Sequence, residues 1–169
     1  MKIGGGGSEN INILQSDDIT LRNLDAVTED NQAFWGGAQL AAAGGKYPHV
    51  QIYNPSGSGV ILLLDSILIS PVTESTYGWG LYNTECTTDV GAVQSKLVGG
   101  AAGNAHVRTE NASSVLVTGF GPVYVASARC YELIAGPPFI IGAAKGIAVY
   151  GVVVNTSVGV AFSIRELTA

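Results

Sequence analysis

Short runs of branched apolar residues, each closed by a turn sequence, constrain the fold of this chain more than any other feature. The clearest run lies near the C-terminal end, where Val158, Val160, Phe162 and Ile164 alternate with small or polar residues. Strict alternation of this kind is typical of a strand that buries one face. We therefore expect this segment to form a strand with one side on the core.

Other segments of the chain repeat this strand-and-turn character. Residues 50–53 predict a strand, residues 54–59 (NPSGSG) a turn, and residues 60–69 a long core strand that completes a hairpin. A last hairpin is expected to join 147–154 to 158–164 through a turn at 155–157. Shorter strands are expected over 115–117, 123–125 and 129–134, the last ending at the loop 135–138.

The segment 76–82 predicts a strand with two different faces. Tyr77, Trp79 and Leu81 lie on one side of it and two glycines on the other, so one face carries bulk and the other allows close approach. The stretch between Asn83 and Asn104 is rich in Gly, Ala and Thr and stays unassigned.

About eight short strands with turns between them favour an all-β fold, an antiparallel β-sandwich of jelly-roll type. A short helix over residues 32–43 is the only helical alternative, and the pairs Gly36-Gly37 and Gly44-Gly45 weaken it. Because strong helices do not alternate with the strands, a parallel α/β sheet is disfavoured.

The chain divides into two parts by composition. Residues 1–32 predict an extended N-terminal arm or linker, and residues 33–169 the sandwich domain. The arm carries four consecutive glycines and an acidic stretch over 25–30, and we expect it to become ordered on a neighbouring subunit. The glycines alone are also typical of a frayed terminus.

Charge is sparse for a protein of 169 residues. Charged residues make up 12% and hydrophobic residues 47%, with a mean hydropathy of +0.32. An ordinary soluble domain carries roughly 25% charged residues. Since exposed apolar patches mark interaction sites, we interpret the composition as a surface that other subunits cover.

The same composition argues against two classes of partner. The net charge is −5 and the eight Lys and Arg residues are scattered, so the chain offers no basic groove for nucleic acid. No run approaches the roughly 18 apolar residues that a spanning helix needs. The first residues, MKIGGGGSEN, lack the apolar run of a secretory signal, so we expect assembly in the cytoplasm without a membrane partner.

No residue pattern indicates a metal site. His49, His106, Cys86 and Cys130 are all the histidines and cysteines of the chain, and no two have the spacing of zinc ligands. We expect His49 on the surface, His106 in a loop or at a strand edge, and the cysteines as small buried hydrophobes. A disulfide between Cys86 and Cys130 remains open from sequence.

No pattern indicates catalysis either. The nucleophile motif G-x-S-x-G is absent, and the glycine-rich stretch 99–103 lacks the Lys-Ser/Thr of a phosphate-binding loop. Glu74, Glu85, Asp89 and Glu110 have the character of solvated turn carboxylates. We therefore expect no catalytic, cofactor-binding or metal-ligating residues, and a protein that is not an enzyme.

Two segments resemble virion proteins of tailed phages. In residues 50–60 a strand ends in Asn54-Pro55, the chain crosses a Ser/Gly turn, and a long apolar strand follows. The C-terminal part is also similar: a loop at 136–138 leads into residues 146–155, and a final strand ends at Arg165 and Glu166. The resemblance implies a jelly-roll capsid decoration (cement) protein or a head- or tail-fibre domain. Such proteins are usually homotrimers seated where capsid subunits meet, and the resemblance implies no catalytic residues.

Three functions follow as hypotheses. The first is a cement protein that bridges capsid subunits, with itself and the major capsid protein as partners. The alternative is a receptor- or glycan-binding head domain of a fibre, in which Tyr77, Trp79 and Tyr82 would stack on sugars, although aromatics that alternate in a strand favour the core. The third, a small polysaccharide-degrading enzyme, needs a carboxylate or histidine cluster that the sequence does not display.

The aromatic residues are the candidates for contacts between subunits. For each of them, burial in the core fits the sequence as well as burial in an interface. The candidates are Phe34, Trp35, Tyr47, Tyr53, Trp79 and Phe139.

Overall fold

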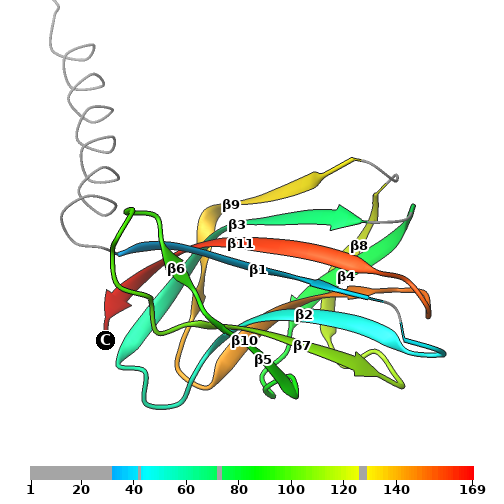
Figure 1. The fold of residues 1–169 in the computed structure, drawn as a ribbon, viewed down its shortest axis with the longest axis horizontal. Coiled ribbons are helices and arrows are strands. Elements are labelled where there is room, and N and C mark those ends of the chain that lie inside the picture. Colours follow the sequence, from blue (N-terminus) through cyan, green and yellow to red (C-terminus); the bar gives the residue numbers. More distant parts are fainter. Residues whose placement is uncertain (1–31, 42, 72–73, 126–128) are drawn as a thin grey trace, which may run out of the picture.

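The computed structural model describes residues 32–41, 43–71, 74–125 and 129–169 of the chain. The arm predicted over residues 1–32 lies outside this part, apart from Gln32, and the first strand begins at Ala33. In the described residues eleven strands form two antiparallel sheets packed face to face, which confirms the predicted all-β sandwich (Figure 1).

The two sheets have five and six strands. Sheet A has the order β6 (Gln94–Ser95), β1 (Ala33–Leu40), β11 (Val158–Thr168), β3 (Val60–Pro71) and β9 (Tyr131–Ile141). Sheet B has the order β5 (Thr88–Ala92), β7 (His106–Ala112), β2 (Tyr47–Asn54), β10 (Lys145–Gly151), β4 (Ser75–Leu81) and β8 (Thr118–Val125). β11 is therefore the central strand of sheet A.

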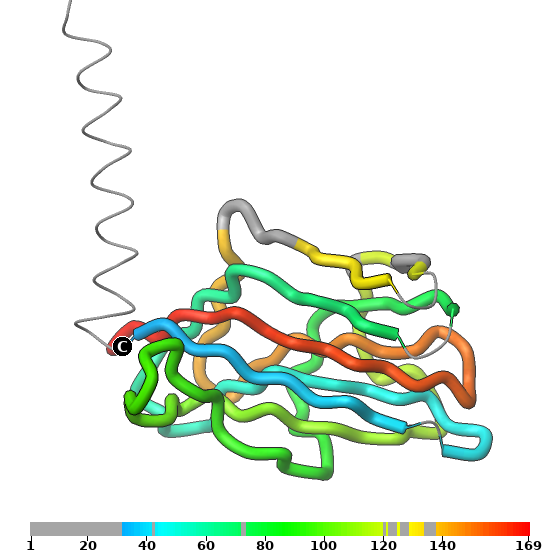
Figure 2. Tube along the Cα trace, turned by 45° about the horizontal axis from the view of Figure 1, so that its top comes forward, coloured from blue at the N-terminus to red at the C-terminus, as the bar shows by residue number. Residues whose placement is uncertain are grey.

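The strand pairing is nested. β1 pairs with β11, β2 with β10, β3 with β9, and β4 with β8. Figure 2 shows the first and last strands of the sequence, β1 in blue and β11 in red, side by side along the sandwich. The segment between β4 and β8 extends one side of the molecule, because β7 and β5 continue sheet B beyond β2 and β6 continues sheet A beyond β1.

The two predicted hairpins are wrong, although their strands form. β2 and β3 flank the predicted turn but lie in different sheets, and the same holds for β10 and β11. A turn sequence reverses the chain locally without determining which sheet receives the next strand. At the first crossing the buried side chain of Asn54 donates from Nδ2 to the carbonyl oxygens of Val60 (2.9 Å) and Ile141 (3.2 Å).

The short helix considered over residues 32–43 is also wrong, because this segment is strand β1. Phe34 is buried between the sheets, which come very close beside it. A Cβ on Gly36 would lie only 2.8 Å from Val107 and 2.9 Å from Val93. Because Gly36 has no side chain, β1 can approach the opposite sheet closely at this position.

Several other boundaries differ from the sequence prediction. Residues 115–117 precede β8 instead of forming a strand. β9 continues to Ile141 through residues 135–138, which were expected to form a loop, and the register shift between Leu64 and Ser66 of β3 accommodates the irregularity. The unassigned stretch 83–104 contains β5 and β6, and β7 was not predicted because most of its side chains are polar.

The core lies between the sheets and follows the predicted alternation. Val158, Val160, Phe162 and Ile164 are all buried, as expected for one face of β11. From the opposite sheet Tyr77 and Trp79 of β4, Val50 and Ile52 of β2, and Ile147 and Val149 of β10 complete it. No helix in the described part of the chain is long and apolar enough to cross a membrane.

Candidate functional site

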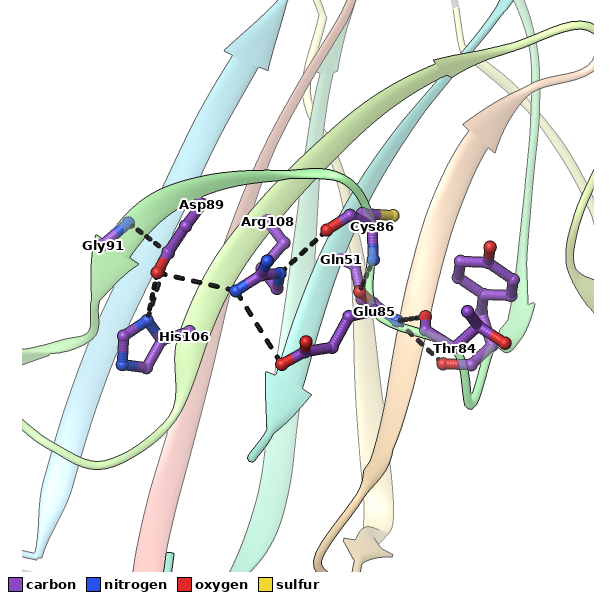
Figure 3. A network of polar contacts seen from close by, with 9 residues as sticks. Gln51, Thr84, Glu85, Cys86, Asp89, Gly91, His106 and Arg108 are labelled. Atoms are coloured by element: carbon purple, nitrogen blue, oxygen red, sulfur yellow. Dashed lines mark hydrogen bonds and ion pairs between the residues drawn. The ribbon is translucent and has the colours of Figure 1, made fainter. Parts of the chain in front are cut away.

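Part of the outer face of sheet B is covered by the protein's own loop after β4. The side chain of Gln51 points outward from β2 yet has no exposed surface. Its Nε2 donates to the carbonyl oxygens of Tyr82 (2.8 Å) and Thr84 (2.9 Å), and its Oε1 accepts from the backbone N–H of Cys86 (2.9 Å) (Figure 3). One glutamine therefore binds the loop to the sheet by three hydrogen bonds.

Charged side chains also hold this loop against sheet B. Arg108 on β7 donates from Nε to the carbonyl oxygen of Cys86 (2.9 Å), and its Nη1 lies 3.5 Å from Asp89 and 3.8 Å from Glu85. His106 contacts the same Asp89 carboxylate at 2.9 Å (Figure 3). Partial burial raises the pKa of Asp89, but the hydrogen bond and charge of His106 outweigh it and leave the pKa below its ordinary value. The network holds residues 82–91 against β7.

Burial controls the chemistry of the thiol under this loop. Cys86 is completely buried, and burial raises the pKa of its thiol to about 12. Cys130 is exposed, and the two cysteines are not joined by a disulfide. The expectation that both cysteines are buried therefore holds for Cys86 only. A neutral buried thiol packs as a small hydrophobe and is a poor nucleophile.

His49 was expected on the surface and is instead completely buried. Its ring stacks on Tyr150 with centroids 5.8 Å apart and lies 6.5 Å from Tyr82. Nδ1 lies 3.0 Å from the carbonyl oxygen of Tyr47, and Nε2 accepts the backbone N–H of Leu116 at 3.3 Å. Nδ1 must therefore carry the proton, and burial lowers the pKa of His49 because it disfavours the charged ring.

The outer face of sheet A lacks such a cover in the described part of the chain. The register aligns Trp35 of β1 with Ser163 of β11 and Ser66 of β3, and one pleat further Gly37 with Ala161 and Leu68. In both rows the residue on β11 is small and uncharged. We call this surface the outer face of sheet A, and it consists of Trp35, Gly37, Gln39, Ser66, Leu68, Ser70, Gly159, Ala161 and Ser163.

Large apolar side chains stand on this face and beside it. Trp35 is 54% exposed and Leu68 37%, and between them lies a hollow of about 410 Å³ over Gly37, Gly159 and Ala161. Toward the other end of the sheet, Ile140 is 74% exposed. Single exposed apolar residues are ordinary, whereas larger apolar patches are typical of interaction surfaces.

An ion pair between Arg165 of β11 and Asp65 of β3 lies on this side of sheet A, and it is internally neutralised. The register shift next to Ser66 inserts Asp65 as an extra residue in β3. Arg165 of β11 donates to both of its carboxylate oxygens, from Nη2 at 2.8 Å and from Nε at 3.1 Å. Bulges often turn a side chain in this way. The hydrogen bond to Asp65 raises the pKa of Arg165, so the pair presents little net charge.

The six residues predicted to contact other subunits differ in their burial. Phe34, Tyr53 and Trp79 are buried in the chain itself, Phe139 packs edge-on against Trp79 with centroids 5.4 Å apart, and Tyr47 is half-buried. Only Trp35 is largely exposed. Tyr77 and Trp79, considered as sugar-stacking residues, belong to the core.

Leu68 and Ile140 were not predicted from the sequence as exposed residues of this surface. A signal was present in the near-continuous apolar runs 60–64 and 67–69 of β3. Strands covered on both faces have such runs, whereas a strand with a solvated face alternates.

Comparison with family models, with curated proteins and with solved structures found no match to this chain.

Proposed function

We propose that this chain is a non-enzymatic structural protein of a virus particle, a capsid decoration (cement) protein that bridges and stabilises neighbouring capsid subunits. The observation that carries the proposal is the exposed outer face of sheet A, with Trp35 and Leu68 standing on it. A sheet face of this composition is stable in water only at a cost, and an assembly that covers it removes that cost.

Two further observations support this proposal. The nested pairing of β1–β4 with β8–β11 corresponds to the rolled-up strand order of a jelly roll, with β5–β7 as an insertion, and jelly rolls are frequent in capsid proteins. The polar clusters of sheet B bind the protein's own loop, so the buried amide of Gln51 and the Arg108 network have a structural use. The proposed location is the virion, assembled in the host cytoplasm.

A co-sedimentation experiment tests this function. Empty shells assembled from the capsid protein of the same virus are mixed with the purified chain, and the unassembled capsid protein serves as control. The proposal predicts saturable binding to shells, none to free subunits, and a raised melting temperature of the decorated shells. A chain that stays in the supernatant at every ratio would contradict the proposal.

A fibre head that binds glycans is the second candidate, and one observation favours it. The exposed ring of Trp35 borders a hollow that Gln39 and Ser70 also line, and an aromatic wall beside amide and hydroxyl groups suits a sugar ring. Glycan-array binding that is lost in Trp35→Ser, with no binding to shells, would favour this candidate over the cement protein.

A further inference from the structure

We infer that residues 18–22 of the N-terminal arm bind as an additional strand along the free edge of β1 in the same chain. The site is the seam between β1 of sheet A and β5 of sheet B, on the side of the sandwich where β6 ends. It lies beside the outer face of sheet A, so the segment leaves that face free for the capsid contact proposed above. The chain would thereby close an open side of its own sandwich.

The edge of β1 is paired over only part of its length. β6 pairs with β1 up to Trp35, and within the described part of the chain no strand continues this pairing along the rest of β1. The carbonyl oxygen of Ala33 accepts the backbone N–H of Lys96 (2.9 Å), so the backbone groups of Ala33 lie on the β6 side. Because backbone groups alternate along a strand, the N–H and C=O of Gly37 and Gln39 face the open edge. These are the groups with which an added strand pairs.

The burial of β1 changes where β6 ends. Phe34 and Gly36 point between the sheets and are buried, whereas Ala38 and Leu40 on the same inward side are only half-buried. The inward residues of a sandwich form its core, and neighbouring strands on both sides shield them from water. The core is therefore partly open at this end of β1, and a further strand would cover it.

A hollow of about 230 Å³ lies along this edge. Gly36 and Gly37 form its wall on β1, and Val90, Gly91 and Val107 form its wall on sheet B. Val90 is the residue that bulges from β5, and its side chain is 52% exposed. The hollow thus offers mostly apolar and glycine surface beside unpaired backbone groups. This combination suits an extended segment with apolar side chains on one face.

Residues 18–22 of the arm (DITLR) have the alternation that this seam requires. Ile19 and Leu21 are apolar, and the three residues between and around them are polar. In a strand the two apolar side chains would point into the hollow and the three polar ones toward solvent. Charged side chains on the new outermost strand would also protect the sheet edge from pairing with other chains.

The connection is long enough for the same copy to supply this segment. Residues 23–32 span up to about 35 Å when extended. The edge from Ala33 to Gln39 is only about 20 Å long. Although the sequence suggested that the arm binds a neighbouring subunit, a tethered segment meets its own edge at a high effective concentration. The other apolar patch of the arm, residues 11–14, needs a longer loop, which costs more entropy to close.

Hydrogen exchange of the full chain, followed by NMR, tests the inference. We expect the amides of Gly37 and Gln39 to exchange slowly, as hydrogen-bonded groups do. The double variant Ile19→Asp/Leu21→Asp directs two carboxylates at the hollow, so exchange at both amides should accelerate at least about tenfold. The amide of Ala38 faces β11 and should stay protected, which shows that the sandwich remains folded.

Ile11→Asp/Ile13→Asp is the matched control, because it makes the same change in the other apolar patch and should leave both amides protected. Val90→Asp, in the wall of the hollow, should accelerate exchange as the Ile19→Asp/Leu21→Asp variant does. Fast exchange at Gly37 and Gln39 in the unchanged chain, or equal exchange in the two arm variants, would overturn the inference. Protection that falls on dilution would also overturn it, because another copy would then supply the segment.

Discussion

The Nδ2 amide of Asn54 donates a hydrogen bond of 2.9 Å to the carbonyl oxygen of Val60, across the crossing from sheet B to sheet A. A second hydrogen bond from the same nitrogen reaches Ile141 of β9 at 3.2 Å. The amide therefore holds the end of β2 against two strands of the other sheet. This single buried side chain therefore stabilises both the turn after β2 and the packing of the two sheets.

Asn54→Ala should lower the free energy of unfolding by about 2 kcal/mol, because it removes the donor of two hydrogen bonds, one of them to a buried carbonyl oxygen. Urea denaturation followed by circular dichroism measures the change. Asn83→Ala, at an exposed position just after β4, is the matched control and should change stability by less than about 0.5 kcal/mol. Equal stability of the two variants would show that the crossing does not depend on this amide.

Glu166→Gln should destabilise the protein by a comparable amount. The buried Glu166 carboxylate accepts the backbone N–H groups of Asn104 (2.7 Å) and Ala105 (2.8 Å) and the side-chain amide of Asn104 (2.8 Å). A glutamine would turn an NH₂ group toward these donors, so we expect a loss of about 2 kcal/mol. Hydrogen exchange should show faster exchange at Ala105, whereas Glu132→Gln, at an exposed site, should leave it unchanged.

Stability should fall as the pH is lowered from 7 to 5 because of His49. Burial lowers its pKa in the folded protein from the ordinary value of 6.5, partly opposed by the Tyr47 carbonyl and by Glu110. Below pH 6.5 the unfolded chain binds a proton that the folded protein does not yet bind, so unfolding becomes more favourable. The contribution is complete above pH 6.5 and is lost as the pH approaches the lowered value.

His49→Gln should flatten this dependence, which denaturation at several pH values measures as the difference between variant and original chain. The Asp89 carboxylate does not interfere, because its pKa lies below 3.8 and its contribution is lost only at lower pH. An unchanged slope between pH 7 and 5 in His49→Gln would be inconsistent with a neutral buried imidazole.

The two thiols should differ in reactivity. Cys86 is buried with a thiol pKa of about 12, and Cys130 is exposed. A chromogenic disulfide reagent should modify one thiol per chain in the native protein and two after denaturation. Cys130→Ser should abolish the native reaction. Rapid modification of Cys86 in that variant would mean that the loop over β2 opens readily.

Parts of the fold could be predicted because one-dimensional patterns determine them. The period-two residues of β11 are buried, and the glycine face of β4 is needed because the ring of Tyr150 lies against Gly78. The choice between a hairpin and a crossing could not be predicted, since it depends on which sheet has room for the next strand. β7 was missed because its residues bind an arginine network, so their polarity conceals a strand.

The sequence predicted that the protein has a covered surface, but it did not predict which residues form that surface. Sparse charge indicated a covered surface, and Trp35 was among the residues named for it. Sequence alone could not separate Trp35 from its neighbour Phe34, because a shift of one residue moves a strand position from one face to the other. Leu68 and Ile140 were found only from the register of β3 with β11 and β9.

Hydroxyl-radical footprinting of the assembled particle and of the dissociated chain tests the central claim most directly. The account predicts that Trp35, Leu68 and Ile140 are labelled strongly in the dissociated chain and protected in the particle. Val115, on the side of sheet B, should show much less protection. Equal labelling of Trp35 in both states would show that the outer face of sheet A stays open to water, and would contradict the account.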